Sequence, residues 1–217
     1  MGTIYVFAQQ NQPQTTPAGG QRRGAPVGPP GQAVPQLAAN AIATASLTEK
    51  QMKLHRSLPS RNGARTITIC VDALLRNKTW EMEWVNEDTP KVLADLLFVG
   101  DVYLLCKVDG DDKAVTERIQ HFITSCEVIE ASLEASKKRG LQSHKILFCT
   151  TTVGKVAFVR QLEPQVHVEV DPSVVRDLEK HVPRIIHVVP RLESPPASGM
   201  HHVTDSFSVY FDMLSAM

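Results

Sequence analysis

The chain has 217 residues, of which 42% are hydrophobic and 21% charged, and its 23 Lys and Arg residues balance its 23 Asp and Glu residues. This length suits one domain with an appendage or two small domains. The zero net charge argues against a nucleic-acid-binding protein, whose affinity rests on neutralising phosphates. The charges are unevenly distributed, because residues 1–65 have a net charge of +6 and the remaining residues have a net charge of −6.

The first part of the chain is a low-complexity leader. Residues 9–36 contain six Pro, five Gly and seven Gln, a composition that cannot bury enough apolar surface to offset the entropy of ordering the backbone. The pattern over residues 37–58 suggests a loose helix with few apolar residues, and residues 59–63 end this helix. We therefore expect a disordered leader and basic linker over residues 1–64, and a folded domain over residues 65–217.

From Arg65 onward, apolar strand patterns alternate with helical patterns. The predicted strands cover residues 66–71, 102–108, 146–149, 166–170 and 185–189. The predicted helices cover residues 88–99, a segment capped by residues 109–112, and residues 127–138, 154–162 and 172–180. Capping signals support two of these helices, since Pro90 and Pro172 lie in their first turns. After a Pro-rich linker, a last helix begins at Thr204 or Asp205 and docks back onto the body.

Strands that are apolar throughout and alternate with helices indicate a parallel sheet covered on both faces. We therefore predict an α/β fold, a Rossmann-like three-layer domain. The four cysteines are too scattered for a disulfide framework, and we expect reduced core thiols. The eight histidines lack metal-ligand spacing, so we expect no metal and no cofactor.

Open parallel sheets place ligands at the carboxyl ends of their strands, but the common catalytic motifs are missing there. No glycine-rich dinucleotide turn follows the first strand, and the chain contains neither a P-loop nor a Gly-x-Ser-x-Gly elbow. These absences weaken the hypotheses of a dinucleotide enzyme, a P-loop nucleotidase and an acyl hydrolase. A nucleotide-binding module without catalysis is a further hypothesis, which the missing turn also disfavours.

One set of residues resembles the site of the haloacid-dehalogenase-type phosphotransferases, which use Asp-x-Asp, then Thr or Ser, then Lys, then acidic metal ligands. The corresponding positions here are Cys70, Asp72, Thr150, Lys155 and Asp171. That chemistry needs a carboxylate nucleophile and Mg²⁺, and Cys70 stands where the nucleophile would be. The layout therefore resembles a degenerate site, although a metal-dependent phosphohydrolase remains the alternative function. Asp72 and Asp171 could equally be turn caps, and Gly154-Lys155 an ordinary helix start.

Trp80 and Trp84 follow the first strand. Tryptophan is enriched at binding hot spots, but it is also a large core residue, so partner contact and core packing both remain open.

A longer motif carries a second resemblance. Residues 145–151 (KILFCTT) precede the segment Phe158, Val159, Arg160, Gln161, Leu162, Glu163 and Pro164, and His167, Asp171-Pro172 and His187-Val188 follow. This series closely resembles the plant-type peroxin-22 peroxisome biogenesis proteins. The resemblance covers roughly residues 65–215, and the leader lies outside it.

This resemblance implies a non-catalytic adaptor. Members of the family hold the peroxisomal ubiquitin-conjugating enzyme at the cytosolic face of the peroxisomal membrane, where that enzyme ubiquitinates the cycling import receptor of matrix proteins for reuse. The same partner and location are therefore expected here, with activation of the enzyme left open. As contact residues we expect Trp80, Trp84, Arg160 and Leu162.

The family also implies membrane association through an N-terminal helix. The longest apolar run, residues 37–47, is shorter than the roughly 20 residues that cross a bilayer. The sequence therefore predicts no span, and the basic stretch from Lys50 to Arg65 suits either a juxtamembrane position or a solvated linker.

Overall fold

A computed structural model describes residues 47–78, 81–110, 112–136, 141–189 and 201–216. Its centre is a six-stranded sheet in which every neighbouring pair runs parallel. In spatial order the strands are β5 (Ile146–Cys149), β4 (Asp101–Lys107), β1 (Thr66–Cys70), β6 (Val166–Glu169), β7 (Arg184–Val188) and β8 (His202–Thr204). This arrangement confirms the predicted Rossmann-like α/β fold.

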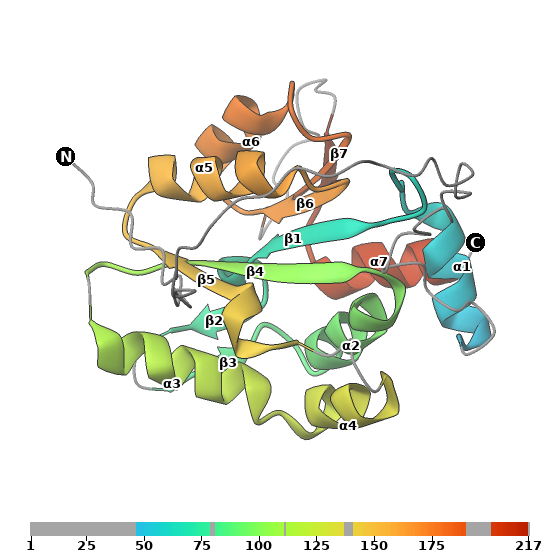
Figure 1. Cartoon of the computed structure of the whole chain (residues 1–217), viewed down its shortest axis with the longest axis horizontal. Helices are drawn as coiled ribbons and strands as arrows, with labels where there is room; N and C mark the ends of the chain where they lie inside the picture. Colours follow the sequence, from blue (N-terminus) through green and yellow to red (C-terminus); the bar gives the residue numbers. More distant parts are fainter. Residues whose placement is uncertain (1–46, 79–80, 111, 137–140, 190–200, 217) are drawn as a thin grey trace, which may run out of the picture.

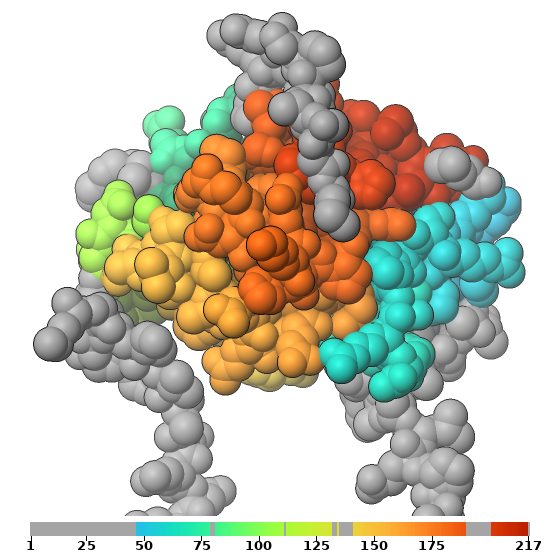
Figure 2. Space-filling view, turned by 90° about the horizontal axis from the view of Figure 1, so that it is seen from above, coloured from blue at the N-terminus to red at the C-terminus, as the bar shows by residue number. Residues whose placement is uncertain are grey.

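Helices cover both faces of this sheet. Figure 1 shows α5 (Thr152–Leu162) and α6 (Pro172–Leu178) over one face, and α2 (Thr89–Val99), α3 (Lys113–Thr124), α4 (Glu127–Ser136) and α7 (Phe207–Ala216) on the other side. α1 (Glu49–Ser57) lies at one end of the sheet, in contact with α7 and α2. Figure 2 looks onto the outer side of α5 and α6.

Two 3₁₀ turns and a short antiparallel strand pair complete the fold. A 3₁₀ turn, η2 (Val71–Ala73), leads into a small antiparallel pair, β2 (Leu75–Asn77) and β3 (Glu83–Trp84), and a second 3₁₀ turn, η3 (Ser143–Lys145), precedes β5. The predicted helix starts are confirmed at α2, with Pro90 in its first turn, and at α6, where the Asp171 side chain accepts from the Ser173 amide.

The two central strands place different side chains on their two faces. Ile67 and Ile69 of β1 and Val166 and Val168 of β6 are fully buried in the larger core, together with residues of α2 and α7. The alternate positions of these strands face α5 and are polar: Thr68 is the register partner of His167, and both are fully buried. The expectation of an apolar strand is therefore wrong for β1, whereas β6 has the alternating pattern expected over residues 166–170.

The structure corrects the sequence analysis at two further points. β8 was not predicted, because its three residues form a strand only by pairing with β7. The folded body also begins earlier than Arg65. Leu54 and Leu58 are buried in the larger core, so α1 belongs to the domain rather than to a linker.

Arg65 fixes α1 to the sheet. Its guanidinium is buried and donates to the carbonyls of His55, Leu58, Pro59 and Val99 at 2.7–3.3 Å. Three of these carbonyls lie at or just beyond the end of α1, where helical backbone oxygens lack an internal partner. Arg65 is therefore an internal cap of α1 and is not available to a membrane surface.

Candidate functional site

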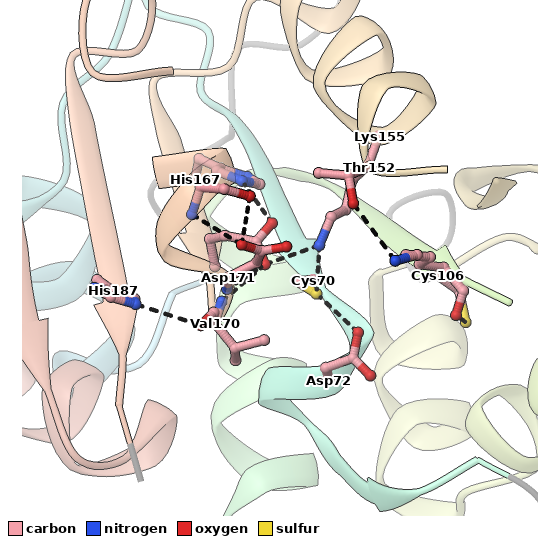
Figure 3. A network of polar contacts seen from close by, with 12 residues as sticks. Cys70, Asp72, Cys106, Thr152, Lys155, His167, Val170, Asp171 and His187 are labelled. Carbon is pink, nitrogen blue, oxygen red and sulfur yellow. Dashed lines mark hydrogen bonds and ion pairs between the residues drawn. The ribbon is translucent and has the colours of Figure 1, made fainter. Parts of the chain in front are cut away.

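The polar face of the central strands ends in a chain of contacting side chains at the carboxyl edge of the sheet (Figure 3). Cys70 is the last residue of β1, Asp72 lies in η2, Lys155 projects from α5, and Glu169 is the last residue of β6. The structure thus brings together Cys70, Asp72 and Lys155, three of the positions that resemble the phosphotransferase site.

A buried ion pair lies at the centre of this chain. Lys155 Nζ is 2.9 Å from Glu169 Oε1, and the two side chains are 3% and 0% exposed. The same carboxylate oxygen accepts from the backbone amides of Val170 and Asp171 at 2.8 and 3.0 Å. Burial alone would raise the pKa of Glu169, but His167 and Lys155 lower it to about 2. Burial opposes the charge of Lys155, but the carboxylate of Glu169 raises its pKa above the ordinary value.

Cys70 is a protonated thiol in this environment. Its Sγ lies 3.4 Å from Lys155 Nζ and donates to Asp72 Oδ2 at 3.2 Å. Burial, followed by the charges of Glu169 and Asp72, raises the pKa of this thiol well above its ordinary value. The thiolate is the nucleophilic form of cysteine, so Cys70 is not an activated nucleophile.

Asp72 is also held by a cation. Lys78 Nζ lies 2.6 Å from Asp72 Oδ1 and donates to the Lys107 carbonyl at 2.8 Å. Burial opposes the charge of Lys78, but Asp72 raises its pKa above the ordinary value. An acid–base role for Asp72 would require this ion pair to open.

The sequence analysis named His167 only as part of the family motif and missed Glu169, and both residues belong to this chain of contacts. His167 Nδ1 is 2.8 Å from Thr68 Oγ1, and its Nε2 faces Glu169 Oε2 at 3.4 Å, outside good hydrogen-bond geometry. The available signal was the alternation in Val-His-Val-Glu-Val over residues 166–170. That pattern is typical of a strand with one wet face, whereas here both faces are buried.

The remaining phosphotransferase-like positions do not complete a catalytic set. Thr150 is exposed just after β5 and lies outside the contact chain. Asp171 caps α6, where its Oδ1 accepts from Ser173 N and Oγ at 2.8 and 2.6 Å. These Ser173 bonds lower the pKa of Asp171, so the expectation of a turn cap is confirmed for this residue.

The donor set at this edge does not fit the Mg²⁺ that the phosphotransferase resemblance implies. Mg²⁺ prefers several oxygen ligands in octahedral geometry. Here a neutral thiol replaces one carboxylate, and ammonium groups lie at 2.9 Å from Glu169 and 2.6 Å from Asp72. Among the described residues, no group of three or more His, Cys, Asp or Glu side chains is arranged to hold a metal ion.

The buried carboxylate predicts a specific acid sensitivity. Glu169 has a pKa of about 2 in the fold and an ordinary value of 4.5, so its charge favours folding above about pH 5. This contribution, about 3 kcal/mol, is lost as pH falls from 5 towards 2. We expect Glu169→Gln to be less stable than the native chain at pH 7, with the difference shrinking as pH falls. Urea unfolding between pH 3 and 7 measures this difference in stability. A difference that does not change with pH would contradict a lowered pKa of Glu169 in the folded protein.

The predicted partner-contact residues have different surroundings. Trp80 lies outside the described residues. Trp84 is half-buried and packs on Phe122, with the ring centroids 5.4 Å apart. Leu162 packs at the edge of the smaller core beneath α5, and Arg160 is exposed. Their part in binding stays a prediction.

The segment Phe158–Pro164 forms the second half of α5 and its end. Val159 is fully buried, and Glu163 adopts a left-handed conformation (φ 45°, ψ 53°) at the C-cap. The Glu163 carboxylate lies 2.7 Å from Arg61 Nη1, on a residue just after α1. The motif therefore positions α5 and ties its end to the start of the domain.

Within the described part of the chain, no helix has the length and apolar character needed to cross a membrane.

Comparisons with known proteins agree on one family. The family model described as "Peroxisome biogenesis protein 22, Haloacid dehydrogenase-like domain" matches residues 57–206, which include all six strands of the sheet. Peroxisome biogenesis protein 22 of Arabidopsis thaliana is 29% identical over 106 residues. The aligned region spans 48% of this chain and 34% of that protein, about a third of the relative's length.

Proposed function

The chain belongs to the peroxisome biogenesis protein 22 family, and from this membership we propose that it acts in peroxisome biogenesis as a non-catalytic adaptor. In this role it binds the peroxisomal ubiquitin-conjugating enzyme and tethers it at the cytosolic face of the peroxisomal membrane. The tethered enzyme ubiquitinates the import receptor of matrix proteins, and the receptor is then recycled. The observation that carries this proposal is the family match across the whole sheet.

The chemistry of the carboxyl edge supports a role without catalysis. The position of the carboxylate nucleophile holds Cys70, whose thiol is buried and protonated. The two carboxylates nearest to it, Asp72 and Glu169, are each paired with a lysine ammonium. Among the described residues at this edge, a phosphoryl group would find neither an unpaired carboxylate at the nucleophile position nor a group of ligands arranged for magnesium.

An adaptor of this kind acts through effective concentration. Holding the enzyme near its substrate converts a bimolecular search into a nearly intramolecular one, and no new catalytic group is needed. The surface of the adaptor that binds the enzyme must therefore be rigid and accessible. Of the proposed contact residues that the structure describes, Arg160 meets both conditions best, because it is exposed on a helix whose Lys155 and Val159 are buried.

A phosphatase assay separates the adaptor from the alternative enzyme. We expect the purified chain to leave a generic aryl phosphate uncleaved with or without Mg²⁺, because Cys70 cannot form the acyl-phosphate intermediate. Asp72→Asn should then leave the background rate unchanged. Mg²⁺-dependent turnover that Asp72→Asn abolishes would contradict the adaptor proposal and support the phosphohydrolase.

Retention of the enzyme on the immobilised chain tests the adaptor role itself. The peroxisomal ubiquitin-conjugating enzyme should be retained, and a cytosolic paralogue should be washed away. Equal retention of both enzymes, or of neither, would count against selective tethering.

A further inference from the structure

Three histidines meet at the β7–β8 edge of the sheet. His187 lies in β7, His202 begins β8, and His201 comes directly before it. The rings of His187 and His201 contact edge to face, with their centroids 5.7 Å apart. The ring of His202 lies at the same centroid distance from the ring of Tyr210 in α7. We call His187, His201 and His202 the histidine cluster.

One member of the cluster is paired with a carboxylate. His201 Nδ1 lies 2.6 Å from Oε1 of Glu179, which is the C-cap of α6. A carboxylate only accepts hydrogen bonds, so Nδ1 of His201 carries the hydrogen. Glu179 can therefore compensate one positive charge in the cluster, and this charge would lie on His201.

His187 disfavours a second positive charge. Its Nε2 lies 3.3 Å from the Val170 carbonyl, which only accepts, so an added proton goes to Nδ1. Burial lowers the pKa of His187 and His201 adds to this effect, although the Val170 carbonyl, Glu169 and Asp171 act in the opposite direction.

His202 disfavours protonation as well. Burial lowers its pKa, and the charges of Arg184 in β7 and of His201 act in the same direction. His187 and His202 are therefore neutral in the fold at pH 7. Because both pKa values lie below the ordinary 6.5, these rings favour the folded edge above about pH 6.5 and favour it less as pH falls below that value.

β8 is a short strand at the end of the sheet. Its three residues pair with β7, and the Val189 amide donates to the Thr204 carbonyl at 2.8 Å. In the described sheet β8 is the last strand, so its separation breaks no further pairing there. α7 is held separately, since Phe207 and Phe211 are buried in the larger core. Local opening of β8 therefore needs less free energy than unfolding of the domain.

We propose that β8 is an acid-sensitive edge strand, which separates from β7 when His187 and His202 are both protonated. Protonated His187 then faces His201 across the two strands, and protonated His202 faces Arg184. These like charges oppose the pairing of β8 with β7. After separation, β7 becomes the edge of the sheet, and its hydrogen-bonding groups are open to another strand.

Amide exchange of the full chain, followed by NMR, tests this proposal. After correction for the intrinsic exchange rate at each pH, protection of the Val189 amide should fall about tenfold between about pH 7 and about pH 5.5. The Ile69 amide in the central strand β1 is the internal reference and should keep its protection. The ring signals of His187 and His202 should shift over the same pH range. The stabilising charge of Glu169 is lost only at lower pH, so the two acid effects are separate.

A double variant removes the two titrating rings. In His187→Gln/His202→Gln, protection of the Val189 amide should change by less than about twofold over the same pH range. His121→Gln is the matched control, because His121 is exposed on α3, and this variant should keep the native response.

Three results would overturn the proposal. Equal protection of the Val189 amide at both pH values in the native chain would show that this edge does not respond to acid. A fall that persists in the double variant would assign the response to other groups. A fall that the Ile69 amide shares would mean that the whole domain opens rather than β8.

Discussion

Replacement of Lys155 by Met is expected to lower the free energy of unfolding by about 3 to 5 kcal/mol. Methionine keeps most of the side-chain volume but removes the ammonium 2.9 Å from Glu169, which is fully buried. The two backbone amides that donate to Glu169 remain, but the ammonium group of Lys155, the only Lys or Arg side chain within ion-pair distance of Glu169 among the described residues, is lost. An uncompensated buried carboxylate is among the costliest defects in a fold.

Denaturant unfolding at pH 7 measures this effect against a matched control. Lys113→Met removes an ammonium that is 87% exposed and pairs with Glu117 at 3.3 Å, so a change within about 0.5 kcal/mol is expected there. The double variant Lys155→Met/Glu169→Gln should lose less stability than the two single variants lose in sum. Each single change leaves the other member of the pair buried without its partner. A loss below about 1 kcal/mol for Lys155→Met would show that this pair does not stabilise the fold.

Replacement of Arg65 by Met should be the second large effect, a loss of about 3 kcal/mol. The change leaves the carbonyls of His55, Leu58, Pro59 and Val99 without their guanidinium donor in a largely buried environment. Because most of these carbonyls belong to the end of α1, the backbone amides of α1 should also exchange their hydrogens with solvent faster than in the native chain.

Arg56→Met is the control for this prediction. Arg56 lies in α1 itself but is exposed, so its replacement should change stability by no more than about 0.5 kcal/mol. Thermal or urea unfolding compares the two variants. Equal stability of Arg65→Met and Arg56→Met would contradict the assignment of Arg65 as the internal cap of α1.

Local signals in the sequence predicted most of the sheet and its helices. Pro90 and Gly100 delimit α2, and the apolar run of residues 146–149 coincides with β5. The parts that were missed depend on distant contacts. β8 exists through its pairing with β7, and the place of α1 in the domain depends on Arg65 and on burial of Leu54 and Leu58.

The site was predictable to the extent that strand ends converge at one edge of a parallel sheet. That rule, together with the resemblance to the phosphotransferase site, grouped Cys70, Asp72 and Lys155, and the structure places Cys70 in contact with both of the others. It could not identify Glu169 as the partner of Lys155, because an acidic residue in an alternating strand is typical of a solvated face. Only the tertiary structure shows that α5 covers this face and that Lys155 supplies the compensating charge.

The central claim is that this chain binds the peroxisomal ubiquitin-conjugating enzyme, and a calorimetric titration of the purified full chain tests it most directly. A cytosolic ubiquitin-conjugating enzyme serves as the control, and co-elution in size-exclusion chromatography detects binding that releases no heat. The account predicts saturable one-to-one binding of the peroxisomal enzyme, with a dissociation constant of about a micromolar or tighter, and none of the control. A folded chain that neither releases heat nor co-elutes with the peroxisomal enzyme would contradict it.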